Sequence, residues 1–288
     1  GLAAPGAQKS EQGVRLVLGG AAALVLIAVL TSLALRAVGS AKGLYDIFGV
    51  ILFITVASLF LCLCFLPGWS RAERSRFIVI FFLFVASTIF WSSFEQDGST
   101  LNLFAKCCVR TDLFGFSFPA SWLQSVNPIL VVMLSPVFAW LWTWLGAKNP
   151  SIPAKFALAL GFAGMGMLLL VPTALRGGQI SPLWPIATYT MFTIGELSLS
   201  PIGQNAIAQL APARISSLMM GVWFLAGAAG RYLAGQFSSH LGFNEDSPRI
   251  MHLPYAKIFA ISGLSAALSG VALMIMIRPI KRLMSDLR

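Results

Sequence analysis

Eight apolar stretches follow one another along the chain, and short segments that hold most of the charged residues separate them. The apolar stretches lie at 14–37, 45–66, 77–104, 121–146, 154–175, 183–210, 215–239 and 255–277. An α-helix rises about 1.5 Å per residue, so about 20 residues cross the ~30 Å hydrocarbon core of a bilayer. The pattern therefore predicts an all-α chain, a polytopic bundle of eight membrane-spanning helices.

The predicted helices differ in the residues of their middle turns. The first two consist almost wholly of Leu, Val, Ala, Ile and Phe, with no acid or amide in their middles, which favours a peripheral position facing lipid. The third, fourth, sixth and seventh carry polar residues at helical spacing, which is typical of helices that line an interior. Small residues in the fifth and seventh, among them Gly164 and Gly230, predict close helix packing.

The sixth predicted helix holds an acidic residue, Glu196, inside an apolar segment. A charged side chain in the bilayer core costs from about 3 to well over 10 kcal/mol, so it normally faces a partner or a water-filled cavity. Glu196 is therefore our first candidate functional residue, and the alternative is a carboxylate that only holds two helices together. Ser200 lies one turn further along the same face, and Pro201 predicts a break in the helix.

A second acidic residue, Glu95, lies in the third predicted helix. The polar residues of this helix recur at steps of three or four and so share one face: Thr88, Trp91, Glu95, Ser99 and Asn102. In one alternative the helix ends at the outer surface beside Glu95, because Gln-Asp-Gly follows it at 96–98. Apolar residues resume at Leu101, which favours a helix that continues.

The fourth and seventh predicted helices add further candidates. Gln124 and Asn127 stand just before Pro128, whose missing backbone N–H is expected to leave a carbonyl free for a ligand. In the seventh helix, Trp223 and Arg231 lie on one face.

The rise per residue places Arg231 level with Glu95, and Trp223 near the depth of Glu196. Arg231 then either pairs with Glu95 near the outer mouth or extends to the outer headgroups, and the sequence leaves both open. Glu196 and Trp223 together would suit an ammonium group, through charge and cation–π attraction. The alternative for Trp223 is simple packing.

Composition agrees with an integral membrane protein. The 288 residues are 57% hydrophobic and only 10% charged, with a mean hydropathy of +0.82, whereas a soluble domain carries about 25% charged residues. The net charge of +10 does not indicate nucleic acid as a partner, because the basic residues lie between apolar segments rather than along one stripe. If the chain starts in the cytoplasm and crosses eight times, most Lys and Arg fall on the cytoplasmic side, and both termini lie there.

No enzyme motif accompanies this pattern. The sequence contains no Walker motif, no HExxH and no Gly-x-Ser-x-Gly, and its four cysteines have neither zinc spacing nor the pattern of a disulfide framework. We therefore predict no catalytic residues, no metal site and no bound cofactor.

Four motifs, in order, resemble those of the proton-dependent oligopeptide transporters, a branch of the major facilitator superfamily. They are FWSSFEQDGS at 90–99, QSVNP at 124–128, GELSLSPIG at 195–203, and MGVWFL at 220–225 with LAG at 233–235. The resemblance implies that the last six spans correspond to transmembrane helices 7 to 12 of that fold. The first two then correspond to the extra helix pair that bacterial members insert between the halves.

This resemblance implies a division of the chain into four parts. Residues 1–13 would be a cytoplasmic linker, 14–66 the inserted two-helix hairpin, 67–76 a cytoplasmic loop, and 77–288 the C-terminal six-helix transporter bundle. The N-terminal six-helix half is then the expected partner. The family's Glu-x-x-Glu-Arg motif and its fourth-helix lysine belong to that half and are not in this sequence.

The resemblance also implies roles for individual residues. Glu196 matches a glutamate that receives the peptide's amino group and pairs with the lysine of the other half, and Asn127 matches an asparagine beside it. Glu95 matches an acid that forms the outer gate with an arginine of the other half. Trp91 and Trp223 match aromatic walls of the substrate pocket.

Two further positions complete the set that the resemblance implies. Ser200 matches a hydroxyl neighbouring the substrate pocket. Arg231 departs from the family, which would have a small amide such as Asn there, and we group it with Glu95 and Glu196 as a residue for proton coupling and gating.

The implied function is symport of di- and tripeptides with protons across a bacterial cytoplasmic membrane, by alternating access around a midplane site. Protons would be the coupling ion. One alternative is a transporter of the same fold for nitrate, a drug or another small solute, since a fold does not fix a substrate. Another is a non-transporting channel or scaffold, in which the polar faces only pack helices.

Overall fold

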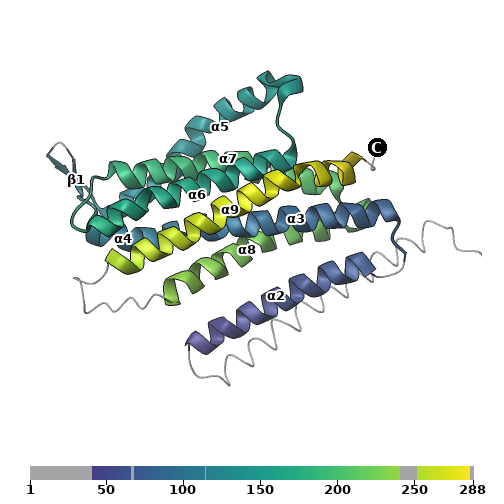
Figure 1. Cartoon of the computed structure of the whole chain (residues 1–288), viewed down its shortest axis with the longest axis horizontal. Helices are drawn as coiled ribbons and strands as arrows, with labels where there is room; N and C mark the ends of the chain where they lie inside the picture. The colour runs from purple at the N-terminus through teal and green to yellow at the C-terminus, as the bar shows by residue number, and fades with distance from the viewer. Residues whose placement is uncertain (1–40, 66–67, 114, 241–251, 286–288) are drawn as a thin grey trace, which may run out of the picture.

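The computed structural model describes residues 41–65, 68–113, 115–240 and 252–285. The long helices in this part of the chain are α2 (Ala41–Phe65), α3 (Arg71–Phe94), α5 (Val126–Trp144), α6 (Ile152–Arg176), α7 (Leu183–Leu210), α8 (Ser216–His240) and α9 (His252–Ser285). They run roughly along one direction, with α5 rising away from the others (Figure 1).

Shorter elements connect these helices. They are the 3-10 turns η1 (Glu95–Gly98), η2 (Ala120–Ser125), η3 (Gly146–Lys148) and η4 (Ala213–Ile215), the helix α4 (Thr100–Cys108), and the strands β1 (Asp112–Leu113) and β2 (Phe116–Ser117). The strands pair antiparallel and had no signal in the sequence. A disulfide joins the adjacent Cys107 and Cys108 in α4, which corrects the expectation that the cysteines form none.

Six stretches of the described residues are long and apolar enough to cross a membrane: Asp46–Phe65, Arg71–Cys108, Ala120–Trp144, Ile152–Arg176, Ala213–Ser239 and Leu253–Lys281. Each corresponds to one of the predicted spans. The sixth predicted span is α7 itself, with the predicted bounds; it is 28 residues long, but its polar face makes it less apolar than the other six. The first predicted span, 14–37, lies outside the described residues.

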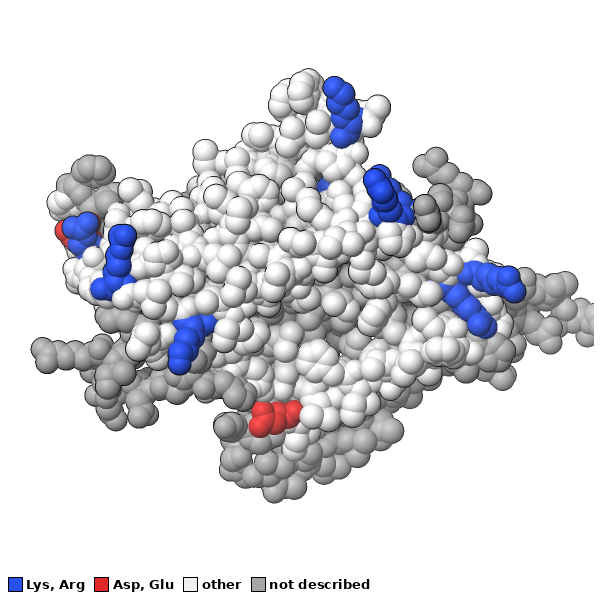
Figure 2. Space-filling view, viewed as in Figure 1, with Lys and Arg blue, Asp and Glu red and all other residues white. Residues whose placement is uncertain are grey.

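The surface agrees with a protein embedded in a membrane. In Figure 2 the Lys and Arg side chains lie in a few separate groups, toward the left and right ends and at the top, and most of the surface between them carries no charge. Large apolar side chains such as Val132 and Ile275 are 76% and 75% exposed. Exposed apolar surface of this extent is stable in lipid but not in water.

Small residues bring α6 and α9 close together, as the sequence predicted for the fifth span. A Cβ added at Gly164 would lie 2.8 Å from the backbone nitrogen of Ala267 and 2.8 Å from the carbonyl oxygen of Gly263. Gly230 of α8 likewise lies against the backbone of Trp91 in α3. Backbones that approach this closely leave no room for a side chain, which is how helices gain packing energy in lipid.

The third predicted span is not one continuous helix, which corrects the expectation for 77–104. Helix α3 ends at Phe94, the four residues Glu95–Gly98 form η1, and α4 begins at Thr100. Ser99, between them, has φ −125° and ψ −96°, outside helical geometry. The polar face predicted from 88 to 102 is therefore interrupted at Glu95.

The two expectations about prolines have different outcomes, and the one for Pro201 needs correction. Pro128 is the third residue of α5, and η2 runs directly into this helix, so the missing N–H leaves the carbonyl of Gln124, four residues earlier, without a donor from this position. Pro201 lies inside α7, which continues on both sides of it without a break. The proline does leave the carbonyl of Leu197, four residues earlier, without its usual intrahelical donor.

Helix α2 lies at the edge of the bundle, in contact with α3 and α8 (Figure 1). Several of its apolar residues are exposed, among them Val50, Ile54 and Leu61 at 58%, 60% and 57%. This placement agrees with the peripheral, lipid-facing position predicted for the second span.

Candidate functional site

Helix α7 presents its polar residues to the first turn of α5. Asn127 donates hydrogen bonds through Nδ2 to Thr193 Oγ1 at 3.0 Å and to Glu196 Oε2 at 3.1 Å. Thr193 is fully buried and in turn donates to the carbonyl of Tyr189 at 2.8 Å. One face of α7 and the start of α5 thus form a continuous set of polar contacts around the Glu196 carboxylate.

The hydrogen-bond partner of the Glu196 side chain among the described residues, Asn127, is neutral. The two salt bridges between described side chains involve Glu73 with Arg214 and Glu95 with Arg231, and neither reaches Glu196. A carboxylate in a low-dielectric setting interacts strongly with any cation that comes close, because little water screens the attraction. The arrangement therefore suits a cation supplied from outside the described part of the chain.

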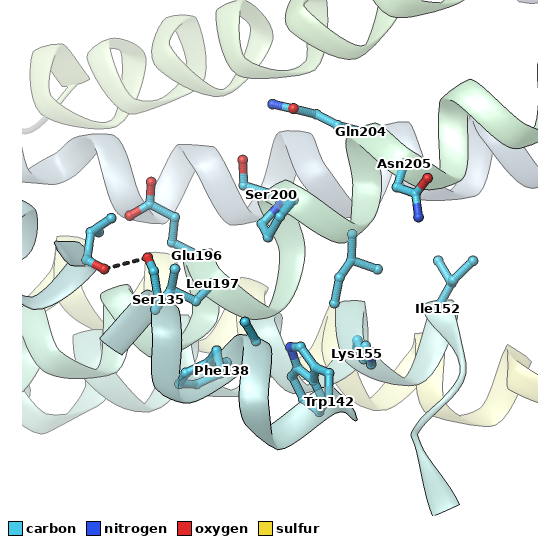
Figure 3. A pocket seen from close by; sticks show the side chains of 14 residues that line it. Ser135, Phe138, Trp142, Ile152, Lys155, Glu196, Leu197, Ser200, Gln204 and Asn205 are labelled. Carbon is cyan, nitrogen blue, oxygen red and sulfur yellow. Dashed lines mark hydrogen bonds between the residues drawn. The ribbon is translucent and has the colours of Figure 1, made fainter. Parts of the chain in front are cut away.

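A cavity of about 590 Å³ opens beside Glu196, between α5, the start of α6, and α7. Glu196 and Ser200 line it on the α7 side, and Ser135 and Phe138 line it from α5 (Figure 3). Both predicted α7 residues thus face the same space. The volume lies within the range of about 300–1,000 Å³ that is typical of small-molecule sites.

Sequence reasoning missed a lysine that lines the same cavity. Lys155, near the start of α6, is only 6% exposed, and its Nζ lies 4.0 Å from the ring centroid of Trp142 in α5 (Figure 3). This cation–π contact provides a partner for the ammonium group away from water. The sequence held no signal for it, because nothing predicted that the two helix ends would meet.

Trp223 does not lie where the sequence placed it. The indole is 5% exposed, packs against Phe156 with ring centroids 6.2 Å apart, and occupies the space beside Gly203. It is not among the residues that line the cavity. The expectation that Trp223 and Glu196 share an ammonium pocket is therefore corrected; in this structure Trp223 packs between helices, the alternative that the sequence left open.

Glu95 and Arg231 form the ion pair that was one of the two readings of the sequence. The Arg231 Nε lies 2.9 Å from Glu95 Oε1, and the two side chains are 67% and 23% exposed. Glu95 caps the end of α3, while Arg231 stands on α8. Trp91 lies one turn before Glu95, half-buried, with its ring 5.1 Å from that of Phe94.

The turn that carries Glu95 contains two polar residues that sequence reasoning treated only as a helix end. Gln96 is fully buried; its Nε2 lies 3.3 Å from the carbonyl of Ala234, and its Oε1 accepts from Thr100 at 2.6 Å. Asp97 accepts a hydrogen bond at 2.5 Å from the hydroxyl of Tyr189. A Gln-Asp pair inside an apolar span was the available signal.

The fold and the site together define a class of protein. Spanning helices enclose a carboxylate that has no cationic partner among the described residues, beside an open cavity, and this combination is typical of a membrane transporter for small solutes.

A model of the POT family matches residues 68–245, and the chain belongs to this family. The resemblance drawn from the motifs is thereby confirmed.

Two curated relatives show the extent of the similarity. The chain is 35% identical over 217 residues to the uncharacterized transporter YclF of Bacillus subtilis, which covers 75% of this chain and 42% of YclF. It is 33% identical over 247 residues to the peptide transporter YePEPT of Yersinia enterocolitica, which covers 82% of this chain and 47% of YePEPT. The chain thus spans about half the length of these relatives.

Solved structures give the same picture of the fold. The crystal structure of a peptide transporter POT in complex with sulfate matches with a TM-score of 0.78 and 33% identity, over 97% of this chain and 55% of that one. A POT family transporter in complex with 5-aminolevulinic acid matches with a TM-score of 0.76 and 26% identity, over 94% and 55%. The chain is a multi-pass membrane protein with the fold of part of these transporters, and these are transporters rather than enzymes.

Proposed function

We propose that this chain supplies the C-terminal half of a proton-coupled symporter of di- and tripeptides in a bacterial cytoplasmic membrane. The observation that carries the proposal is Glu196, a carboxylate held by Asn127 at 3.1 Å, facing a cavity of about 590 Å³ without a cationic partner among the described residues. Relatives described as peptide transporters support the substrate class.

The chemistry follows from the charge of Glu196. Every peptide with a free amino terminus carries an ammonium group, whereas its side chains vary, so a carboxylate that binds the ammonium group accepts many sequences. The same carboxylate would pair with a lysine of the N-terminal half when no substrate is present. Substrate binding or protonation removes that attraction, and the two halves are then free to rock around the site.

Glu95 would act at the outer end of the same bundle. An arginine of the N-terminal half would compete there with Arg231, which already lies 2.9 Å from the Glu95 carboxylate. Because Arg231 is largely exposed, its hold on Glu95 is weak, on the order of 1 kcal/mol or less. The outer gate would therefore close by exchange of one guanidinium for another.

The energy for accumulation would come from the proton. One charge that moves inward down the membrane potential supplies about 2.3 kcal/mol per 100 mV. In this scheme both termini of the chain lie in the cytoplasm, so η1 and Glu95 lie toward the outer side and the start of α6 toward the inner side.

Uptake of dialanine by proteoliposomes tests the proposal, with the transporter that carries this chain together with its first six helices. We expect saturable uptake that an inward proton gradient drives above equilibrium and that a protonophore abolishes. Flux that does not saturate would favour a channel, and uptake of nitrate or a drug that dialanine does not inhibit would favour another substrate. Either outcome would overturn the proposal.

A further inference from the structure

The three consecutive polar side chains of the 3-10 turn η1 each contact a different residue of the helices around it. Glu95 pairs with Arg231 on α8, and Gln96 contacts the α8 backbone at Ala234. Asp97 accepts a hydrogen bond from the hydroxyl of Tyr189 in α7. A single turn of four residues therefore contacts two other helices of the bundle through its side chains.

Asp97 is the group in this turn that the proposed mechanism does not use. Its Oδ1 accepts the hydrogen bond from Tyr189, a residue that is only 1% exposed. Its backbone carbonyl accepts a second bond from Gln124 Nε2 at 3.3 Å, at the end of η2, which leads into α5. Asp97 thus connects the interrupted third span to α7 and to the start of α5.

The contacts of Asp97 continue toward Glu196. Tyr189 lies on the α7 face that carries Thr193 and Glu196, and its carbonyl accepts from the Thr193 hydroxyl at 2.8 Å. Asn127 then joins Thr193 and Glu196, at 3.0 and 3.1 Å. The chain of hydrogen bonds includes a backbone carbonyl, so it transmits position along α7 but carries no proton.

We propose that Asp97 is a second proton-binding carboxylate of the transporter, whose charge sets how firmly η1 holds α7 and thereby the Glu196 site. An ionised carboxylate accepts a hydrogen bond about twice as strongly as a neutral group does. A proton from the outer water that binds Asp97 therefore weakens its bond to Tyr189. Helix α7, with Glu196 on it, is then freer to move.

Few charged groups lie around Asp97 among the described residues. Glu95, in the same turn, is a carboxylate that pairs with Arg231 of α8; Tyr189 of α7 donates a neutral hydroxyl, and Gln124 of η2 donates a neutral amide. No Lys or Arg of the described residues forms an ion pair with Asp97. Ionised Asp97 therefore depends on hydrogen bonds alone, which makes its charge state responsive to a proton.

Substitutions at Asp97 and Tyr189 separate the charge of Asp97 from its shape. Of the two measurements below, only the one of transport rests on the proposed function. Asp97→Asn keeps an oxygen that accepts from Tyr189 but cannot ionise. Tyr189→Phe keeps the carboxylate but removes the bond. Asp46→Asn is the control, because Asp46 is an exposed carboxylate on α2, hydrogen-bonded at 3.0 Å to Gln236.

The first measurement is infrared difference spectroscopy between acid and neutral pH on the purified full-length transporter, which needs no transport. We expect Asp97→Asn to remove one carbonyl band of a protonated carboxylic acid, Tyr189→Phe to shift that band, and Asp46→Asn to leave it unchanged. If Asp97→Asn does not fold, the Tyr189→Phe spectrum decides. A band unaffected by these variants would overturn the proposal.

The second measurement is the initial rate of dialanine uptake against external pH. We expect Asp97→Asn to lower the ratio of the rates at acid and neutral pH at least roughly threefold, because one proton-binding step is lost. A rate reduced equally at every pH would show a purely structural role and overturn the proposal. Dialanine exchange without a proton gradient tests the proposed function separately. The proposal for Asp97 and the proposed function can therefore fail independently of each other.

Discussion

The carboxylates of Glu196 and Glu95 have opposite surroundings. Glu196 stands in the uninterrupted helix α7, with a neutral amide as its partner at 3.1 Å. Glu95 stands at the end of α3, and the guanidinium of Arg231 lies 2.9 Å away. Among the described residues, Arg231 pairs with Glu95 and no cation pairs with Glu196. The proposed function rests on this contrast, with Glu196 as the binding group and Glu95 as a group that exchanges partners.

Loss of the charge at Glu196 should have the largest effect on transport. We expect Glu196→Gln to lower proton-driven dialanine uptake about 30-fold or more, since truncation of a desolvated charge pair costs about 2–5 kcal/mol. The measurement is uptake into proteoliposomes with an inward proton gradient. The control is Asp46→Asn, which removes an exposed carboxylate of α2 and should transport like the parent. A Glu196→Gln variant that still concentrates dialanine would refute the role assigned to Glu196.

Loss of the amide beside Glu196 should have a smaller effect. We expect Asn127→Leu to raise the KM for dialanine about 10-fold, because a hydrogen bond to a charged group contributes about 1.5–3 kcal/mol. Thr193→Val is the matched control, since it removes the other acceptor of Asn127 and leaves the bond to Glu196. Equal KM values for the two variants would show that the Asn127 bond to Glu196 does not matter for binding.

The Glu95 pair should contribute little to stability. We expect a double-mutant cycle of Glu95→Gln and Arg231→Gln to give a coupling of about 1 kcal/mol or less, because the Arg231 side chain is 67% exposed and water screens the attraction. Thermal unfolding of the four variants in detergent measures it. A coupling above about 2 kcal/mol would show a pair too strong for exchange with a second arginine, and the contrast with Glu196 would fail.

A change in the packing of α6 against α9 should have the smallest effect on function. We expect Gly164→Ala to lower the unfolding temperature, since its Cβ would lie 2.8 Å from the α9 backbone and overpacking costs about 1–3 kcal/mol. Gly161→Ala, on the same helix, meets nothing within 4 Å and should unfold like the parent. Dialanine KM should remain unchanged in both folded variants; a changed KM would tie substrate binding to the α6–α9 contact.

Most spans in the described part of the chain were predictable because lipid demands long apolar helices. The bounds of α7 agree with the prediction, and so does the contact between Asn127 and Glu196. The latter came from a family resemblance, because spacing along one helix does not say which other helix lies opposite. Depth along the helices placed Glu95 and Arg231 at one level, so their ion pair was one of the two outcomes that the sequence left open.

The errors share a physical cause. A helix end at Glu95 was the alternative, and the apolar residues that resume after it favoured a continuous helix instead. Hydropathy does not register a single turn whose polar groups are satisfied inside the protein. Trp223 was misplaced because an indole packs against Gly203 as readily as it lines a pocket. The packing of α7 on α8 decides whether the Trp223 indole packs or lines a pocket, and a single sequence does not show how two helices pack.

The binding of dialanine and of N-acetyl-dialanine, which lacks the ammonium group, tests the central role of Glu196 most directly. Calorimetry on the full-length transporter and its Glu196→Gln variant gives four dissociation constants. We expect the parent to prefer dialanine at least about 10-fold, as one charge-assisted bond allows, and the variant to bind both equally. A variant that keeps the parent's preference would contradict the account.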